Sequence, residues 1–102
     1  MVRRLARISP EAAAWLLAEI RYLAGRSPSK AVAVVAKMRA ARENLADYPL
    51  LGSQGLLPDT RRLVVGAYVL TVRTRDGLIE VVAIRHGRQA DADAPVGIGD
   101  DG

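Results

Sequence analysis

Apolar side chains recur every three or four positions in the first half of the chain and alternate with polar ones in the second half. The first spacing predicts two helices, at residues 10–24 and 28–45. Each is introduced by a Ser-Pro pair, in which serine caps the free amides and proline takes the first helical position. Gly25 is expected to end the first helix. Only Arg26 and Ser27 then separate the helices, so they must turn back on each other as a helical hairpin.

The alternating half predicts an antiparallel sheet that follows a loop at residues 48–59. Strands are expected at residues 61–65, 68–74 and 78–85 or 78–86, with turns at Gly66-Ala67 and Asp76-Gly77. Gly66 begins the first turn, and Asp76 and Gly77 form the second. These residues tolerate the positive φ angles that two-residue hairpin turns require. A further edge strand is expected at residues 2–8. The predicted fold class is therefore α+β, with the order β-α-α-β-β-β.

The two turns also determine which residues face each other across the sheet. With Val65 opposite Tyr68 and Arg75 opposite Leu78, the register pairs Leu70 with Ala83 and Tyr68 with Arg85. One face is then apolar and is expected to pack against the helices. That face consists of Leu63, Val65, Tyr68, Leu70, Val72, Ile79, Val81 and Ala83. The other face consists of Arg62, Val64, Val69, Thr71, Arg73, Glu80, Val82, Ile84 and His86. On this second face, an exposed apolar patch is predicted at Val64, Val69, Val82 and Ile84.

Length and composition limit the kinds of protein that the chain can be. Its 102 residues suffice for one small domain, expected at residues 1–90, with an acidic, disordered tail at residues 91–102. There is no cysteine, which excludes disulfides, thiolate zinc sites and thiol catalysis. No apolar run approaches the length of a membrane span, and the N-terminal segment lacks the apolar part of a secretion signal. A cytoplasmic protein is therefore expected.

Charge is distributed unevenly along the chain. There are 15 Lys and Arg residues against 11 Asp and Glu, a net charge of +4. Four of the acidic residues, Asp91, Asp93, Asp100 and Asp101, lie after the last basic residue, so the first 90 residues carry +8. Such a basic body favours an acidic partner, either nucleic acid or an acidic protein segment, over ordinary surface charge. The tail either shields the basic body or is an inert extension, and the inert extension is the favoured interpretation.

His86 is the only histidine, and it lies between Arg85 and Arg88. A metal site needs several clustered ligands, which one histidine without neighbouring carboxylates does not supply, so no metal or cofactor is expected. General acid–base cleavage of RNA needs a group that titrates near neutral pH and cations that stabilise the phosphate. His86 and the two arginines contain those parts. The alternative, a solvent-exposed histidine at the end of a strand, is the more common case.

Two segments carry a resemblance to a known family. Residues 61–70 have the pattern Arg-x-Leu-Val-x-Gly-x-Tyr-x-Leu, and residues 84–88 read Ile-Arg-His-Gly-Arg. With the preceding helical hairpin, the chain up to Gln89 resembles the RelE/ParE superfamily of bacterial toxins. The resemblance implies an N-terminal strand, two helices and an antiparallel sheet. In this superfamily RelE-like members cut messenger RNA in the ribosome, whereas ParE-like members inhibit DNA gyrase.

Val69 is the residue that favours one branch over the other. RelE-like ribonucleases typically have an arginine just after the Gly-x-Tyr of the hairpin, and a valine there cannot neutralise a phosphate. Loss of such a preorganised charge typically costs about 3 kcal/mol of barrier. The resemblance therefore implies a ParE-like gyrase inhibitor that is not an enzyme. The alternative is a RelE-like, ribosome-dependent endoribonuclease with Arg61, His86 and Arg88 as its catalytic residues.

The ParE-like resemblance implies two partners. One is a ParD-like antitoxin, joined to the toxin in a heterotetramer or a larger complex, and the other is DNA gyrase as the target. Neither membrane binding nor sequence-specific nucleic-acid binding is expected. Aromatic and exposed apolar side chains are favoured as antitoxin anchors, and charged ones as contacts to gyrase. The predicted partner-binding residues are Trp15, Tyr22, Arg62, Val64, Val69, Arg73, Ile84, His86 and Arg88.

Overall fold

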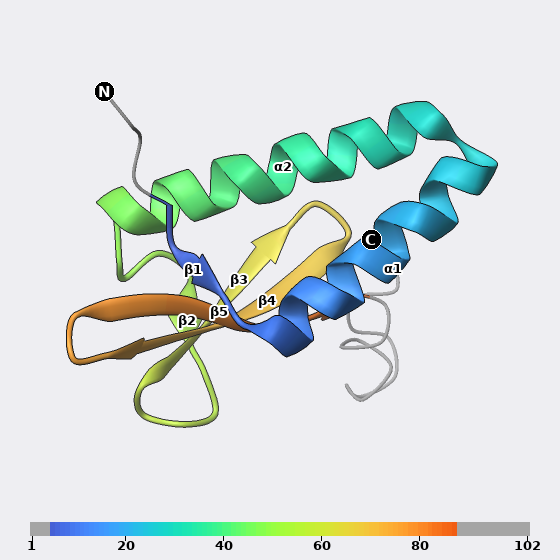
Figure 1. The fold of residues 1–102 in the computed structure, drawn as a ribbon. Helices are drawn as coiled ribbons and strands as arrows, with labels where there is room; N and C mark the ends of the chain where they lie inside the picture. Colours follow the sequence, from blue (N-terminus) through green and yellow to red (C-terminus); the bar gives the residue numbers. More distant parts are fainter. Residues whose placement is uncertain (1–4, 88–102) are drawn as a thin grey trace, which may run out of the picture.

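A computed structural model describes residues 5–87 as two helices and five strands (Figure 1). Helix α1 spans Pro10–Arg26 and helix α2 spans Pro28–Asp47. The strands are β1 (Arg7–Ile8), β2 (Ser53–Gln54), β3 (Thr60–Val65), β4 (Tyr68–Arg75) and β5 (Leu78–His86). The predicted α+β fold is confirmed, with β2 as an additional short strand inside the predicted loop. The predicted tail at residues 91–102 lies outside the described residues, as does Arg88.

Local signals set the start of α1 but not its end. Ser9 Oγ accepts the backbone N–H of Ala12 at 3.1 Å, as expected of a capping serine. The predicted end at Gly25 is wrong, because the helix continues to Arg26. Ser27 is the C-cap of α1 and the N-cap of α2 at once, and its backbone N–H donates to the Leu23 carbonyl at 2.6 Å. A single residue thus makes the whole connection, and the two helices form the sharp V seen in Figure 1.

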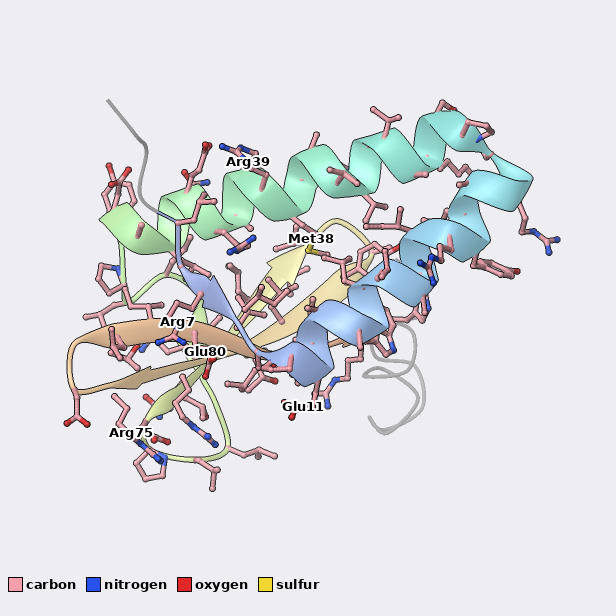
Figure 2. All side chains as sticks on the ribbon, in the orientation of Figure 1. Arg7, Glu11, Met38, Arg39, Arg75 and Glu80 are labelled. Carbon is pink, nitrogen blue, oxygen red and sulfur yellow. The ribbon has the colours of Figure 1, made fainter. Side chains whose placement is uncertain are left out.

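The core lies between the helical hairpin and one face of the sheet. Helix α2 contributes an apolar stripe at three- and four-residue spacing, in which Met38 points toward the sheet while Arg39 points away from it (Figure 2). The largest fully buried side chains are Leu45, Leu70, Val72 and Val81. Complete burial of each contributes about 1.5–3 kcal/mol to folding. This core holds the helices on one side of the sheet and leaves the opposite side, called the far face below, without helices (Figure 1).

The sheet has the strand order β1-β5-β4-β3-β2. The short strand β1 pairs parallel with β5 at one edge, with Arg7 opposite Glu80, and β2 pairs antiparallel with β3 at the other edge. The predicted pairing of β3 with β4 is confirmed, from Val65 opposite Tyr68 to Arg61 opposite Val72. Positive φ angles occur at Gly66, Asp76 and Gly77, as the two predicted hairpin turns require.

A β-bulge in β5 changes the predicted register beyond Val81. Val72 faces Val81, but Thr71 faces Ala83, so Val82 has no partner in β4. The predicted pairs of Leu70 with Ala83 and Tyr68 with Arg85 are therefore wrong. One extra residue moves every following side chain to the opposite face. Ile84 and His86 consequently lie on the helix-facing side, and Ala83 and Arg85 lie on the far face.

The predicted exposed apolar patch is wrong in two of its four members. Ile84 is buried, because the bulge turns it toward the core. Val69 keeps its predicted place on the far face, but it is only 3% exposed. It lies on the central strand between Val64 and Arg85 of the two neighbouring strands. Val64 is exposed as predicted, at 66%, and Val82 is half-buried.

Candidate functional site: a carboxylate cluster and an arginine groove

Four side chains from α1, β4 and β5 form a contact cluster on the helix-facing side of the sheet. This Glu19 cluster consists of Trp15, Glu19, Tyr68 and His86. The Glu19 side chain is 11% exposed, accepts the Tyr68 hydroxyl at 2.7 Å, and has its Oε1 3.3 Å from His86 Nε2. The three rings pack with centroid distances of 5.2–6.0 Å. Trp15 and Glu19 share one face of α1 because they are four residues apart, and the bulge places His86 opposite Tyr68.

Tyr68 acts in this cluster as a hydrogen-bond donor. Burial, then the hydrogen bond to Glu19 and the charge of that carboxylate, raise the pKa of Tyr68 from 10.0 to about 12. The hydroxyl therefore keeps its proton at every physiological pH. The cluster connects α1 to the end of β5. It also gives polar partners to the nearly buried Glu19 carboxylate, which would otherwise be unpaired in the core.

The structure does not bring Arg61 and His86 together. Arg61 lies opposite Val72 and His86 opposite Tyr68, which separates them by about 13 Å along the strand direction. Arg61 Nη2 instead donates to the Gly52 carbonyl at 2.7 Å. The third residue of the predicted catalytic alternative, Arg88, lies outside the described residues.

A groove next to the far face is lined by four arginines. It has a volume of about 380 Å³ and lies between the segment that follows β2 and strands β3, β4 and β5. Its lining residues are Gln54, Gly55, Leu56, Leu57, Thr60, Arg61, Arg62, Thr71, Arg73 and Arg85. None of them is acidic. The Nε atoms of Arg61 and Arg73 are buried and have no hydrogen-bond partner within residues 5–87. With four arginines and no acidic residue in its lining, this arginine groove has the charge to bind an anionic group.

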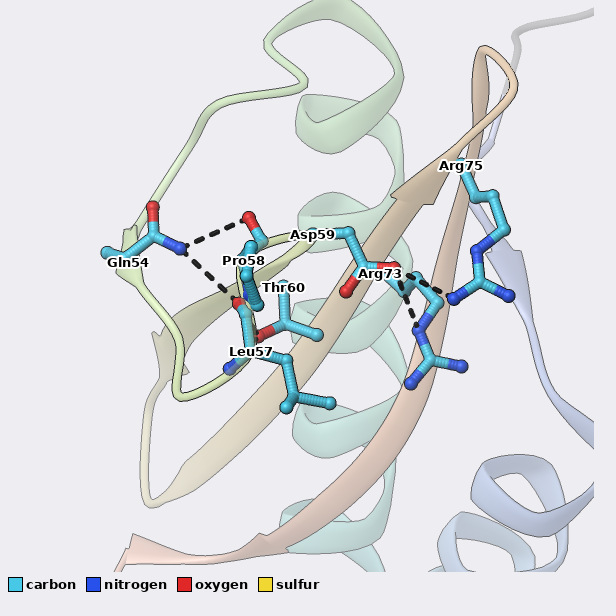
Figure 3. Close-up of polar contacts among 7 residues, drawn as sticks. All are labelled: Gln54, Leu57, Pro58, Asp59, Thr60, Arg73 and Arg75. Atoms are coloured by element: carbon cyan, nitrogen blue, oxygen red, sulfur yellow. Dashed lines mark hydrogen bonds and ion pairs between the residues drawn. The ribbon is translucent and has the colours of Figure 1, made fainter.

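Side-chain hydrogen bonds hold one wall of the arginine groove in place (Figure 3). Thr60 Oγ1 donates to the Leu57 carbonyl at 2.8 Å, and Gln54 Nε2 donates to the Leu57 and Pro58 carbonyls at 3.3 and 3.2 Å. Asp59 Oδ2 accepts from Arg75 Nη2 at 3.0 Å and lies 3.7 Å from Arg73 Nε. The Arg75 hydrogen bond is the main cause of the lowered pKa of Asp59.

The predicted partner-binding residues fall in different parts of the molecule. Arg62 and Arg73 line the arginine groove, whereas Trp15 and His86 belong to the Glu19 cluster on the other side of the sheet. Tyr22 is 58% exposed on α1, with the Arg26 guanidinium 5.1 Å from its ring centroid. These residues therefore do not form one continuous site.

Two residues central to the site were absent from the predicted set. Glu19 is a carboxylate on the inward face of α1, and its four-residue spacing from Trp15 was the available signal. Arg85 lies beside His86 in the sequence, but the predicted register, which has no bulge, places it on the helix-facing side. The bulge brings it into the arginine groove.

The side chains of the arginine groove suit the binding of an anionic group. Arginine remains protonated and cannot serve as a general base, and the other polar side chains of the groove are hydroxyls and one amide. Within residues 5–87, no three His, Asp or Glu side chains lie close enough together to hold a metal ion. In the same range, no helix combines the length and the apolar character needed to cross a membrane.

Comparisons with known proteins identify the family. Residues 6–91 match the family model described as "ParE toxin of type II toxin-antitoxin system, parDE". "Toxin RelE2" of Caulobacter vibrioides is 33% identical over 65 residues, which cover 64% of this chain and 74% of that protein. A solved structure of the "Chromosomal ParDE TA system from P. aeruginosa" has the same fold, with a TM-score of 0.70 at 19% identity over 82% of this chain and 96% of that one. The predicted resemblance is confirmed, and the chain belongs to the ParE toxin family of type II toxin–antitoxin systems.

Proposed function

We propose that this toxin inhibits DNA gyrase by binding to it, without catalysing a reaction, and that a ParD-like antitoxin neutralises it. The observation that carries the non-enzymatic part is the separation of His86 from the arginine groove. His86 lies on the helix-facing side with Glu19, whereas Arg62, Arg73 and Arg85 project from the far face. Cleavage of RNA by the predicted residues would need Arg61 and His86 around one phosphate, but they lie about 13 Å apart along the strand direction.

Charge supports a DNA-bound target. The first 90 residues carry +8, and the arginine groove concentrates part of that charge without an acidic residue in its lining. Such a surface steers a protein toward an acidic assembly and raises the association rate, most strongly at low salt. Arg62 and Arg73 are the proposed charged contacts to gyrase, and His86, with a side chain 40% exposed, is a further candidate.

The antitoxin is proposed to dock on exposed apolar side chains. Tyr22 and Val64 are the members of the predicted surface that are more than half exposed. Aromatic anchors of this kind contribute strongly to binding once a partner covers them. We expect Tyr22→Ala to weaken complex formation at least about tenfold, while Tyr48→Ala, at a tyrosine that is 65% exposed at the end of α2, leaves it unchanged. Titration of labelled antitoxin against each variant measures this, and equal affinities would remove Tyr22 from the interface.

Purified gyrase tests the proposed target directly. The toxin is expected to reduce DNA supercoiling and to raise the amount of gyrase–DNA cleavage complex. Arg62→Gln with Arg73→Gln should lower the potency at least about tenfold. The matched control is Arg39→Gln, because Arg39 points away from the sheet on α2 (Figure 2). If the wild-type toxin leaves both gyrase readouts unchanged, the proposal is refuted.

A ribosome-dependent ribonuclease is the second candidate function. The similarity to the protein named RelE2 and the four-arginine lining of the groove favour it. It predicts new cleavage sites in messenger RNA soon after the toxin is expressed, and loss of those sites in His86→Gln. Sequencing of RNA 5′ ends in expressing cells checks both points. Intact messenger RNA in growth-arrested cells would exclude this function.

A further inference from the structure

Two of the four arginines that line the arginine groove are exposed and unpaired. Arg62 on β3 and Arg85 on β5 have no hydrogen-bond or ion-pair partner for their side chains in the described part of the chain. The other two are engaged, because Arg61 donates to a backbone carbonyl and Arg73 lies beside the Asp59 carboxylate (Figure 3). Arg62 and Arg85 are therefore the charges of the groove that an external ligand can reach most readily.

The strand register spreads the arginines over the far face of the sheet. Arg62 lies opposite Thr71 of β4. Arg85 lies opposite Val69, which precedes Thr71 on the same face of β4. The spacing of strands and residues then puts the Cα atoms of the two arginines about 10 Å apart across the sheet and about 7 Å apart along it. Arg73 follows Thr71 on this face, about 13 Å from Arg85 along the strands.

The side chains that line the groove are mostly of the kinds that bind phosphate. Four are arginines, two are threonines and one is a glutamine, beside Gly55, Leu56 and Leu57, and none of the lining residues is acidic or aromatic. Arginine, threonine and glutamine are among the side chains that contact the phosphate oxygens of DNA. Aromatic side chains are the usual anchors of protein interfaces and the stacking surfaces for single-stranded nucleic acid. A lining without them favours the backbone of a duplex over both.

The length of the arginine row corresponds to several phosphates. One strand of duplex DNA carries a phosphate about every 3.4 Å along the helix axis, so the about 13 Å between Arg85 and Arg73 covers about four of them. Arg62 and Arg85 are free to meet two phosphates. Arg73 is the weaker third contact, because Asp59 offsets part of its charge. Two or three phosphate contacts are therefore expected.

We propose that the arginine groove binds the phosphate backbone of double-stranded DNA without reading its sequence. Phosphate contacts fix the position of a protein on a duplex but carry no sequence information, so the affinity is weak and nearly equal for all sequences. In the inhibited complex this DNA is the segment that gyrase holds, and the groove contacts that DNA rather than the enzyme. For this identification the inference rests on the proposed function, but DNA binding itself is a property of the toxin alone.

The salt dependence of DNA binding tests the proposal. The fluorescence anisotropy of a short labelled duplex is measured with the full chain at several NaCl concentrations. With two or three phosphate contacts, the association constant should fall about 10- to 40-fold between about 50 and 200 mM NaCl. Arg62→Gln and Arg85→Gln should each make the slope of log K against log[NaCl] shallower by about 0.9, the value for one phosphate contact.

Arg21→Gln is the matched control, because Arg21 is exposed on α1 and does not line the groove. It removes the same charge as the groove variants but should leave the slope unchanged. Since Arg62 and Arg85 are exposed and unpaired, their variants should keep the Tm of the wild-type toxin, which thermal unfolding checks. Equal slopes for the control and the groove variants would assign the binding to net charge alone and overturn the proposal.

Competitors identify the ligand of the groove. Unlabelled duplex DNA should displace the labelled duplex at least about tenfold better than polyglutamate or single-stranded RNA at the same concentration of charge, because the duplex has the highest charge density and stacking surfaces are missing. Equal or better competition by polyglutamate would assign the groove to an acidic protein segment. Equal or better competition by the RNA would assign it to RNA, and either result would overturn the proposal.

The gyrase assay separates this inference from the proposed function. A toxin that binds the duplex through Arg62 and Arg85 but leaves supercoiling by gyrase unchanged refutes the proposed function and supports DNA as the ligand of the groove. If the toxin inhibits gyrase while the groove variants bind DNA as tightly as the wild type, the proposed function stands and the DNA ligand is refuted.

Discussion

Replacing Tyr68 by phenylalanine removes one hydroxyl and keeps the ring that packs on Trp15 and His86. The hydroxyl donates to Glu19 at 2.7 Å, and the Glu19 side chain is only 11% exposed. Hydrogen bonds to charged groups contribute about 1.5–3 kcal/mol, so we expect the free energy of unfolding to fall by about 2 kcal/mol. In a domain of this size that corresponds to a decrease in Tm of about 8–16 °C.

The same substitution should remove a pH dependence at alkaline pH. The folded chain keeps the Tyr68 proton to about pH 12, whereas the unfolded chain releases it near pH 10.0. The folded state therefore binds more protons between these values, so the stabilisation is complete below pH 10 and is lost as the pH rises to 12. Two pKa units correspond to about 2–3 kcal/mol. Tyr68→Phe has no such proton and should show a flatter decline in the same interval.

Urea unfolding followed by Trp15 fluorescence measures both effects. Trp15 is the only tryptophan, and its ring lies 6.0 Å from Tyr68 and 5.2 Å from His86, so its emission reports on the Glu19 cluster directly. Tyr22→Phe is the matched control, since this tyrosine is 58% exposed and should change stability by less than about 0.5 kcal/mol. Equal stability of Tyr68→Phe and the control, or an unchanged loss between pH 10 and 12, would refute the assignment of a hydrogen-bonded, nearly buried carboxylate.

Five further substitutions test the rest of the fold. Gly52→Ala should destabilise by about 1–3 kcal/mol or more, because Gly52 has φ +92° and an added Cβ would overlap the backbone of β3. Gly25→Ala, in the last turn of α1 with open space around it, should instead stabilise by about 0.5–1 kcal/mol, and thermal unfolding distinguishes the two signs. Leu45→Ala should lower the free energy of unfolding by about 2–5 kcal/mol, since Leu45 is fully buried. Leu50→Ala should change this free energy little, because Leu50 is 73% exposed, and chemical denaturation measures both variants. The Arg75 hydrogen bond lowers the pKa of Asp59, so the stability that this carboxylate contributes is present above pH 3.8 and is lost as the pH falls below it. Asp59→Asn should therefore flatten the acid side of the curve of stability against pH. An unchanged acid side would contradict the arginine contacts.

Much of the fold was predictable because its signals are local. Ser9 and Pro10 start α1, and the short connection at Ser27 leaves the helices no geometry except a hairpin. The Asp76-Gly77 turn fixes the pairing of Arg75 with Leu78, and the register then follows residue by residue as far as Val81. Each of these features depends on the φ and ψ preferences of a few neighbouring residues.

The bulge at Val82 has no comparable signal. Val81, Val82 and Ile84 are all apolar, so either register gives β5 an apolar side chain to bury, and periodicity cannot choose between them. The choice depends on packing: the bulged register turns Ile84 into the core, where it is 6% exposed, and sets His86 beside Glu19. The prediction that Ile84 is exposed was wrong for this reason.

Elements, turns and family follow from the order of residues along the chain, because helix caps, two-residue turns and side-chain periodicity act over a few positions. The composition of the Glu19 cluster and of the arginine groove follows from contacts between distant segments. Glu19 meets His86 across 67 positions, and Arg62, Arg73 and Arg85 converge from three strands. Such contacts depend on strand register and helix packing. In a strand, one inserted residue reverses the face of every side chain that follows. Only the tertiary structure therefore places the histidine and the arginines on opposite sides of the sheet.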